Sequence, residues 1–292
     1  MQEPIPIFVL GTKGRSGTGY LCALLRHHPD CGPPPAILER EDWLLLNTAP
    51  LIDFATAVKD RIGNGRYEPR DATGLDDDLL LAIGRGIADY LGSASPETSH
   101  IVVKTPMLDG LENRKRLFPR AKVVIIVRYG PDSVESSRRT FLENPRGEPL
   151  SFEQHCRRWS HTTQKIFAVM DQYPGDLMTV RYEDLLCDRD RRIRQMCRFL
   201  GLDPARYDFA AADETAVYGS SSYGRKNGEV TWAPVAKTDA FQPLGRSRDW
   251  TLEQHQQFNQ ICGTVMTRLG YPLIESAEEL SRWRQQLKDF SL

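Results

Sequence analysis

A buried-strand pattern, a glycine-rich turn and a helix pattern follow one another at the start of the chain, and this succession constrains the fold most. Residues 5–10, "IPIFVL", are apolar throughout, whereas residues 18–28 repeat apolar positions at helical spacing. The turn between them, "GTKGRSGTG", holds four glycines and two basic residues. Glycines let a backbone approach a ligand closely, and a helix N-terminus offers unpaired N–H groups to an anion. The pattern therefore predicts an anion-binding loop between a strand and a helix.

Strand and helix patterns alternate along the rest of the chain. Strands are predicted at 101–104, at 121–128 and within 176–185, where the strand ends near Arg181. Helices are predicted at 50–65, 76–92, 107–118, 131–143, 151–173, 188–200 and 251–269. Residues 31–36, "CGPPPA", are predicted to be a loop because successive prolines cannot continue a helix. Residues 208–247 are predicted to be a long ordered excursion or a lid.

This alternation indicates an α/β fold. We expect a single domain over residues 1–292, with a central parallel sheet that is flanked by helices on both faces. The strand that leads into the glycine loop is expected near the point where the strand order reverses, which is where such sheets bind ligands.

The balance of charges and the cysteine pattern exclude several classes of protein. Lysine and arginine total 38, aspartate and glutamate total 39, and the formal net charge is -1. Because proteins that bind nucleic acid are more often clearly basic, we expect no nucleic-acid partner. No apolar run approaches the ~20 residues of a membrane span. The apolar run at the N-terminus is too short for a signal peptide. The six scattered cysteines predict reduced thiols in a cytoplasmic protein.

The glycine loop does not fit the usual nucleotide-binding motifs. A Walker A loop, GxxxxGK[ST], that starts at Gly11 would need a glycine and a lysine where Ser16 and Gly17 stand. A GxGxxG motif fails too, because Cys22 follows Gly17 and Gly19. We find no obvious carboxylate placed to hold Mg²⁺. The loop therefore predicts a phosphate cradle that works without a metal.

Four stretches in order resemble the PAPS-dependent sulfotransferase family, where PAPS is 3′-phosphoadenosine 5′-phosphosulfate. They are "GRSGTGYL" (14–21), "VVIIVRYGPDSVESS" (123–137), "VRYEDL" (180–185) with "RRIRQMCRFLGL" (191–202), and residues 244–271, which end in "LGY". The resemblance covers essentially the whole chain and is closer to the bacterial and tyrosyl-protein branch than to the cytosolic small-molecule branch. It implies a P-loop NTPase-like sulfotransferase fold, PAPS as donor, PAP as product and no metal.

The same resemblance implies which residues hold the nucleotide. In the family, the glycine loop binds the 5′-phosphosulfate. An arginine at a strand end and a serine eight residues later bind the 3′-phosphate. The implied residues are Lys13, Gly14, Arg15, Ser16, Gly17, Thr18, Gly19 and Tyr20 in the loop, Arg128 and Ser136 at the 3′-phosphate, and Tyr182, Ser221, Arg225, Lys226 and Arg246 elsewhere around the nucleotide. The chemistry agrees, since two anionic ends need two cradles and arginine can bind two phosphate oxygens at once.

The resemblance also implies catalytic residues. Arg15 and Lys104 match basic residues of the family that stand against the leaving phosphate and the transferring group. The general base is harder to place, because Pro106 stands where the small-molecule branch carries a histidine. In the bacterial and tyrosyl-protein branch, a glutamate after the "HPD" segment is the general base. Glu39 and Glu41 are therefore the candidates here, and Glu39 is our choice.

The expected reaction is transfer of a sulfuryl group to a hydroxyl or an amine. The expected partner is an acceptor that is a small molecule, lipid, sugar or natural product. A homodimer is also compatible with the sequence. Two other interpretations remain at this stage. One is a metal-dependent P-loop kinase, which the missing GK[ST] weakens. The other is a catalytically inactive nucleotide-binding protein.

Overall fold

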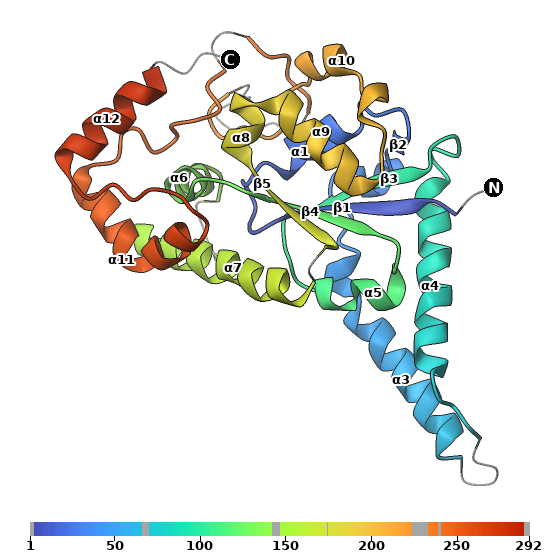
Figure 1. Cartoon of the computed structure of the whole chain (residues 1–292). Helices are drawn as coiled ribbons and strands as arrows, with labels where there is room; N and C mark the ends of the chain where they lie inside the picture. Colours follow the sequence, from blue (N-terminus) through green and yellow to red (C-terminus); the bar gives the residue numbers. More distant parts are fainter. Residues whose placement is uncertain are drawn as a thin grey trace.

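A five-stranded parallel sheet forms the centre of the molecule (Figure 1). The computed structural model describes residues 3–65, 70–141, 147–173, 175–223, 233–238 and 241–288. The strands are β1 (Ile5–Gly11), β2 (Cys31–Gly32), β3 (His100–Thr105), β4 (Lys122–Val127) and β5 (Leu177–Arg181), in the spatial order β2-β3-β1-β4-β5. All neighbouring strands run parallel. Their carboxyl ends therefore share one edge, and β1 lies at the switch point between β3 and β4, as predicted.

Alternate residues of the central strands enter two separate cores. In β1, Phe8 and Leu10 face one core, whereas Ile7 and Val9 face the other. All four side chains are at most 1% exposed. Burial of each such side chain stabilises the fold by about 1.5–3 kcal/mol. Apolar runs without alternation are the consequence of this two-sided burial.

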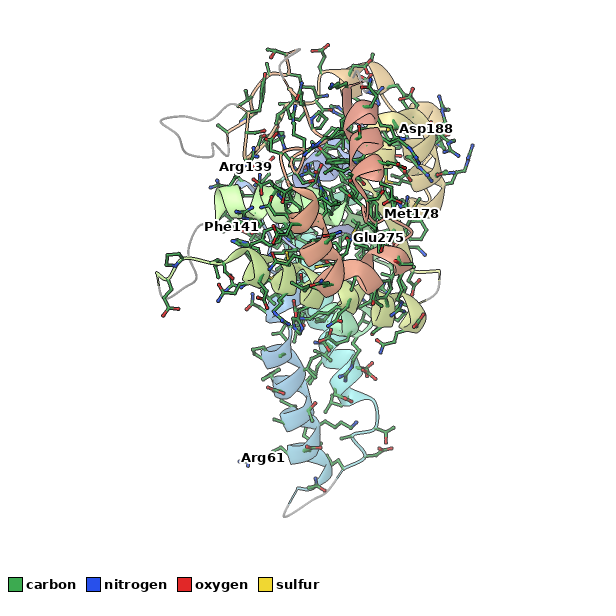
Figure 2. All side chains as sticks on the ribbon, turned by 90° about the vertical axis from the view of Figure 1, so that its left-hand side faces the viewer. Arg61, Arg139, Phe141, Met178, Asp188 and Glu275 are labelled. Atoms are coloured by element: carbon green, nitrogen blue, oxygen red, sulfur yellow. The ribbon has the colours of Figure 1, made fainter. Side chains whose placement is uncertain are left out.

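Helices cover both faces of the sheet (Figure 1). Those that pack in the core with Phe8 are α3 (Ala49–Gly63), α4 (Leu75–Gly92), α5 (Arg114–Leu117), α6 (Gly130–Thr140), α7 (Phe152–Gln172) and α11 (Leu252–Arg268). Those in the core with Ile7 are α1 (Thr18–Leu25), α8 (Tyr182–Cys187), α9 (Arg189–Leu200) and α10 (Phe209–Asp213). The short α2 (Ala36–Glu39) follows β2, and α12 (Ala277–Lys288) lies beyond α11. The far ends of α3 and α4 project from the body as a hairpin, which Figure 2 shows from a second side.

Several predicted elements differ from the structure at defined points. The helix predicted at 107–118 is mostly wrong, because only a 3-10 turn, Leu111–Asn113, and the short α5 form there. Gly110 stops the helix: its φ is +81°, and a Cβ atom there would lie 1.7 Å from the carbonyl oxygen of Leu45. Part of the loop predicted at 31–36 pairs with β3 as β2.

Candidate active site

The glycine loop forms the predicted link between β1 and α1, and it is held by close contacts. Gly17 precedes α1 with a φ of +105°, a value that favours glycine. A Cβ atom on Gly17 would lie 2.5 Å from the Tyr182 ring, and one on Gly11 would lie 2.4 Å from the Ser16 Oγ. Arg15 also has a positive φ, +83°. Such a backbone costs an ordinary residue about 1–3 kcal/mol and is found mainly at functional sites.

Arg15 connects the loop to two distant segments of the chain. Its Nε donates a hydrogen bond to the Ser136 Oγ at 3.1 Å, and its guanidinium also donates to the carbonyl oxygen of Gly219. Ser136 lies on α6, and its Oγ is 3.0 Å from the Ser221 Oγ. The structure thus brings together Arg15, Ser136 and Ser221, which the sequence placed in one nucleotide site.

Arg128 and Arg246 lie in the same region. Arg128 donates to the carbonyl oxygens of Arg15 at 3.3 Å and Pro243 at 2.7 Å, and its guanidinium lies 4.8 Å from the centre of the Tyr182 ring. Arg246 donates to the Ser220 Oγ at 3.3 Å, and the Arg246 residue is 8% exposed. Five segments of the chain therefore meet at the carboxyl edge of the sheet.

These arginines gather positive charge in a largely buried region. Burial, followed by the charge of Arg128, lowers the pKa of both Arg15 and Arg246 to about 10. Arg128 forms an ion pair with Asp132, with 3.7 Å between the Arg128 Nη2 and the Asp132 Oδ2. The Asp132 oxygens already accept from the backbone N–H groups of residues 245 and 247 and from a serine hydroxyl. The three guanidinium groups therefore concentrate positive charge at one place and repel one another.

Two buried polar atoms of this region have no hydrogen-bond partner within the part of the chain that the structure describes. They are the Ser16 Oγ and the Arg128 Nε. A buried polar group without a partner is costly. Both atoms can donate to an oxyanion, so the loop, its neighbours and the clustered positive charge fit an anionic ligand.

A groove of about 1230 Å³ adjoins the arginine cluster. Tyr20, Lys237, Phe241 and Pro243 are among its lining residues. The Tyr20 ring lies 6.0 Å from the Tyr182 ring between centroids, and the Lys237 Nζ lies 5.7 Å from the Tyr20 ring centroid. The groove has space and aromatic surface for a ligand of nucleotide size next to the anion site.

Lys104, at the end of β3, has acidic neighbours. Its Nζ lies 3.9 Å from the Glu41 Oε1, and burial lowers its pKa while the charge of Glu41 raises it. Burial raises the pKa of Glu41, against the opposing effect of Lys104. Asp42 is 4% exposed, and burial raises its pKa too, although a hydrogen bond from the Leu44 N–H acts against this. Lys104 thus has two neighbouring carboxyl groups with raised pKa values.

Glu39 lies in a different environment. Its Oε1 accepts from Arg26 at 2.9 Å, and its side chain is 52% exposed. Sequence reasoning chose Glu39 over Glu41, whereas the ion pair with Lys104 belongs to Glu41.

The other predicted residues have different positions around the loop. Gly14 lies near Phe141, since a Cβ atom on it would be 3.8 Å from that ring. Thr18 is buried at the start of α1, and a Cβ atom on Gly19 would meet open space. The electrostatic neighbours of Lys13 belong to α7 and α11. Arg225 and Lys226 lie outside the described residues.

The comparison with protein families decides the affiliation. The model described as "Sulfotransferase family" matches residues 6–206. This chain belongs to the sulfotransferase family.

Individual relatives agree. The chain is 26% identical over 210 residues to protein-tyrosine sulfotransferase 1 of Danio rerio, an alignment that covers 69% of this chain and 54% of that protein. It is 27% identical over 305 residues to nodulation protein NoeE of Sinorhizobium fredii. That alignment covers 92% of this chain and 67% of NoeE. This chain thus spans about half the length of the first of these relatives. The solved sulfotransferase domain from the curacin biosynthetic pathway shares the fold, with a TM-score of 0.54 and 19% identity over 94% of this chain and 100% of that chain.

Two features of this site were not predicted from the sequence. Asp132 holds the 244–247 segment through both carboxylate oxygens, and its position four residues after Arg128 on the following helix was the available signal. Asp42 and Trp43 pack beside Lys104, where the N–H of Trp43 donates to the Thr105 Oγ1 at 3.3 Å. Trp43 has a φ of +54°, and no sequence pattern predicts this value. Among the described helices, none is long and apolar enough to cross a membrane.

Proposed function

We propose that this protein transfers a sulfuryl group from PAPS to a hydroxyl or an amine of an acceptor such as a small molecule, lipid, sugar or natural product. The observation that carries the proposal is the cluster of Arg15, Arg128 and Arg246, where burial and then the charge of Arg128 lower the pKa of Arg15 and Arg246, beside the Ser16 Oγ and the Arg128 Nε that lack a partner among the described residues. Membership of the sulfotransferase family supports it. The six free cysteines support a reducing, cytoplasmic compartment.

The residues present fit both anionic ends of PAPS. The loop amides, Arg15 and the unpartnered Ser16 hydroxyl would hold the 5′-phosphosulfate. Arg128 and Ser136 would hold the 3′-phosphate. The groove lined by Tyr20 would receive the adenosine, with the Tyr182 ring beside Tyr20. Ser221 and Arg246 stay candidates for the nucleotide near Ser136 and Ser220. Arg225 and Lys226 stay candidates for the nucleotide on the basis of resemblance alone.

PAPS supplies an activated sulfuryl group, whose S–O bond to the phosphate breaks as the acceptor oxygen attacks. Arg15 would donate hydrogen bonds to the phosphate oxygen on which negative charge develops. Its position is fixed in advance by Ser136 and Gly219, so little reorganisation is needed at that moment. Lys104 would stabilise charge on the transferring group, because burial keeps its ammonium away from bulk water.

We propose Glu41 as the general base of this sulfotransferase. Its carboxylate lies beside Lys104, the pKa of Glu41 is raised by burial, and a raised pKa makes a carboxylate a better base near neutral pH. Glu39, the choice from sequence, pairs with Arg26 on an exposed surface and so serves as the comparison.

The acceptor side carries exposed apolar side chains. Trp43 is 38% exposed and Met107 is 38% exposed, and both flank the end of β3 beside Lys104. Ile37 on α2 is 82% exposed. Exposed apolar groups beside polar catalytic groups are typical of ligand sites. They support an acceptor with an apolar body.

A thermal-shift experiment tests the proposed donor. PAP at 100 times its Kd, without any metal, should stabilise the protein by about 2.7 kcal/mol. The melting temperature should then rise by roughly 5–10 °C. ATP with Mg²⁺ at the same concentration should give a clearly smaller shift, because it carries no 3′-phosphate for Arg128. A larger shift with ATP and Mg²⁺ would favour a kinase, and no shift with millimolar PAP would contradict the proposed donor.

Arg128 should be needed for binding of PAP. In Arg128→Met the affinity should fall about tenfold or more, since a hydrogen bond to a charged group contributes about 1.5–3 kcal/mol and 1.4 kcal/mol is tenfold. Isothermal titration calorimetry measures this loss. Arg116→Met is the control, because Arg116 pairs with Asp76 and Asp77 at α4. A loss in Arg128→Met no greater than in the control would remove Arg128 from the 3′-phosphate site.

A further inference from the structure

The glycine loop has cationic side chains with two different sets of neighbours. Arg15 belongs with Arg128 and Arg246, whose charges act on its pKa. Lys13, two residues earlier, has Arg158 of α7 as the cation that acts most on it, together with the thiols of Cys156 and Cys262. The loop therefore also borders a second region, which residues of α7 and α11 form.

This second region contains two buried nitrogen atoms that lack a hydrogen-bond partner among the described residues. They are the Lys13 Nζ and the His155 Nδ1. His155 is 2% exposed. Burial, with a contribution from Arg158, lowers the pKa of Lys13 to about 8, so most of its ammonium groups are still charged at pH 7. Burial first, and then nearby cations led by Lys13, lower the pKa of His155 to about 4. A buried ammonium without a hydrogen-bond acceptor is costly, so the region is poised to accept an anion.

The acid that acts on His155 already has other partners. Glu135 is the one carboxylate whose charge acts appreciably on His155. Its oxygens accept from Arg138 at 2.9 Å, from Arg139 at 2.8 Å and from the Trp250 Nε1 at 2.9 Å. It therefore cannot serve Lys13 as a counter-ion, and the region keeps a net positive charge.

Exposed side chains border this region. Arg158 is exposed, whereas Lys13 and His155 supply buried atoms. Phe141, which is 43% exposed and lies near Gly14, follows α6 on the same side of the molecule as Arg139 (Figure 2). A ligand that enters here meets an apolar ring and cations beside the loop that holds the donor.

We infer that Lys13, His155 and Arg158 form a subsite for an oxyanion, a carboxylate, sulfate or phosphate, that the acceptor carries in addition to the group that is sulfated. The inference rests on the proposed function. Ammonium, imidazole N–H and guanidinium are all donors, which an oxyanion can satisfy together. The donor nucleotide has its own cations in Arg15, Arg128 and Arg246, so the second set is left for the acceptor. The preferred acceptors of this enzyme are therefore anionic hydroxyl compounds with an apolar portion.

Calorimetry on protein saturated with PAP tests this subsite. The probes are inorganic sulfate, and 4-hydroxyphenylacetate against its neutral amide. Wild-type protein should bind sulfate saturably with PAP present, and should bind the carboxylate about tenfold or more tightly than the amide, as expected for a charged hydrogen bond. Lys13→Met and Arg158→Met should each remove most of this preference. Arg157→Met is the matched control, since the neighbouring Arg157 pairs with Glu153 at 2.7 Å on the exposed side of α7.

The outcomes separate the subsite from the donor site. If sulfate competes with PAP, or if Lys13→Met weakens PAP binding as much as sulfate binding, Lys13 belongs to the donor site and the inference is wrong. Equal binding of carboxylate and amide to the wild type also overturns it. Arg158→Met, a surface change, keeps the test available if Lys13→Met does not fold. Failure of PAP itself to bind would instead contradict the proposed function.

Discussion

Replacement of Arg15 with methionine should lower kcat for sulfuryl transfer by about 10²–10³, the usual effect of removing one preorganised donor to a developing oxyanion. The guanidinium is largely buried and held by Ser136 and Gly219, so its position is fixed by the protein before substrate binds. Methionine keeps most of the length of the side chain and removes both the charge and the donors. Single-turnover transfer from isotopically labelled PAPS to an acceptor selected from a panel of phenols and alcohols measures the effect.

Arg15→Lys separates charge from geometry in the same assay. Lysine keeps the positive charge but lacks the planar fork that can donate to Ser136, Gly219 and a phosphate oxygen together. We expect it to recover part of the loss, because electrostatic stabilisation remains. If Arg15→Met retains more than about a tenth of wild-type kcat, where tenfold is 1.4 kcal/mol, Arg15 is a structural link between α6 and the 219–221 segment.

The parts of the fold that were predictable are those in which one physical constraint acts on neighbouring residues. Residues 123–127 are all apolar because β4 is buried on both faces, with Val123 in one core and Val124 in the other. The helix predicted at 107–118 failed because a distant contact decides it. The Leu45 carbonyl occupies the place of a side chain at Gly110, and no local pattern reports this.

The meeting of the glycine loop with Arg128 was predictable because both follow the ends of strands. Arg128 comes directly after β4, and the glycine loop follows β1, so a parallel sheet brings them to one edge. Which glutamate pairs with Lys104 was not predictable, because side-chain direction there depends on irregular backbone. Glu39 ends the one-turn helix α2, and Trp43 with its positive φ lies just beyond Asp42. A shift of two residues in such a segment exchanges which carboxylate meets Lys104.

Glu41→Gln should lower kcat by about 10²–10⁴, the usual contribution of a general base. Glutamine keeps the size and polarity of the side chain but cannot take the proton from the attacking hydroxyl. The affinity for PAP should stay nearly unchanged, because Glu41 pairs with Lys104 and has no contact with the arginine cluster among the hydrogen bonds and ion pairs of the described residues. In the wild type, kcat/KM should rise with pH through the pKa of Glu41, which burial places above that of an ordinary glutamate.

Glu39→Gln is the matched comparison, because it makes the same chemical change two residues away. It removes only an exposed ion pair with Arg26, and such pairs contribute about 0–1 kcal/mol to stability. We therefore expect kcat of Glu39→Gln to stay close to that of the wild type. The reverse result, with Glu39→Gln inactive and Glu41→Gln active, would restore the choice made from sequence. If both variants are active, Asp42→Asn is the next test, since this buried carboxyl group with a raised pKa also neighbours Lys104.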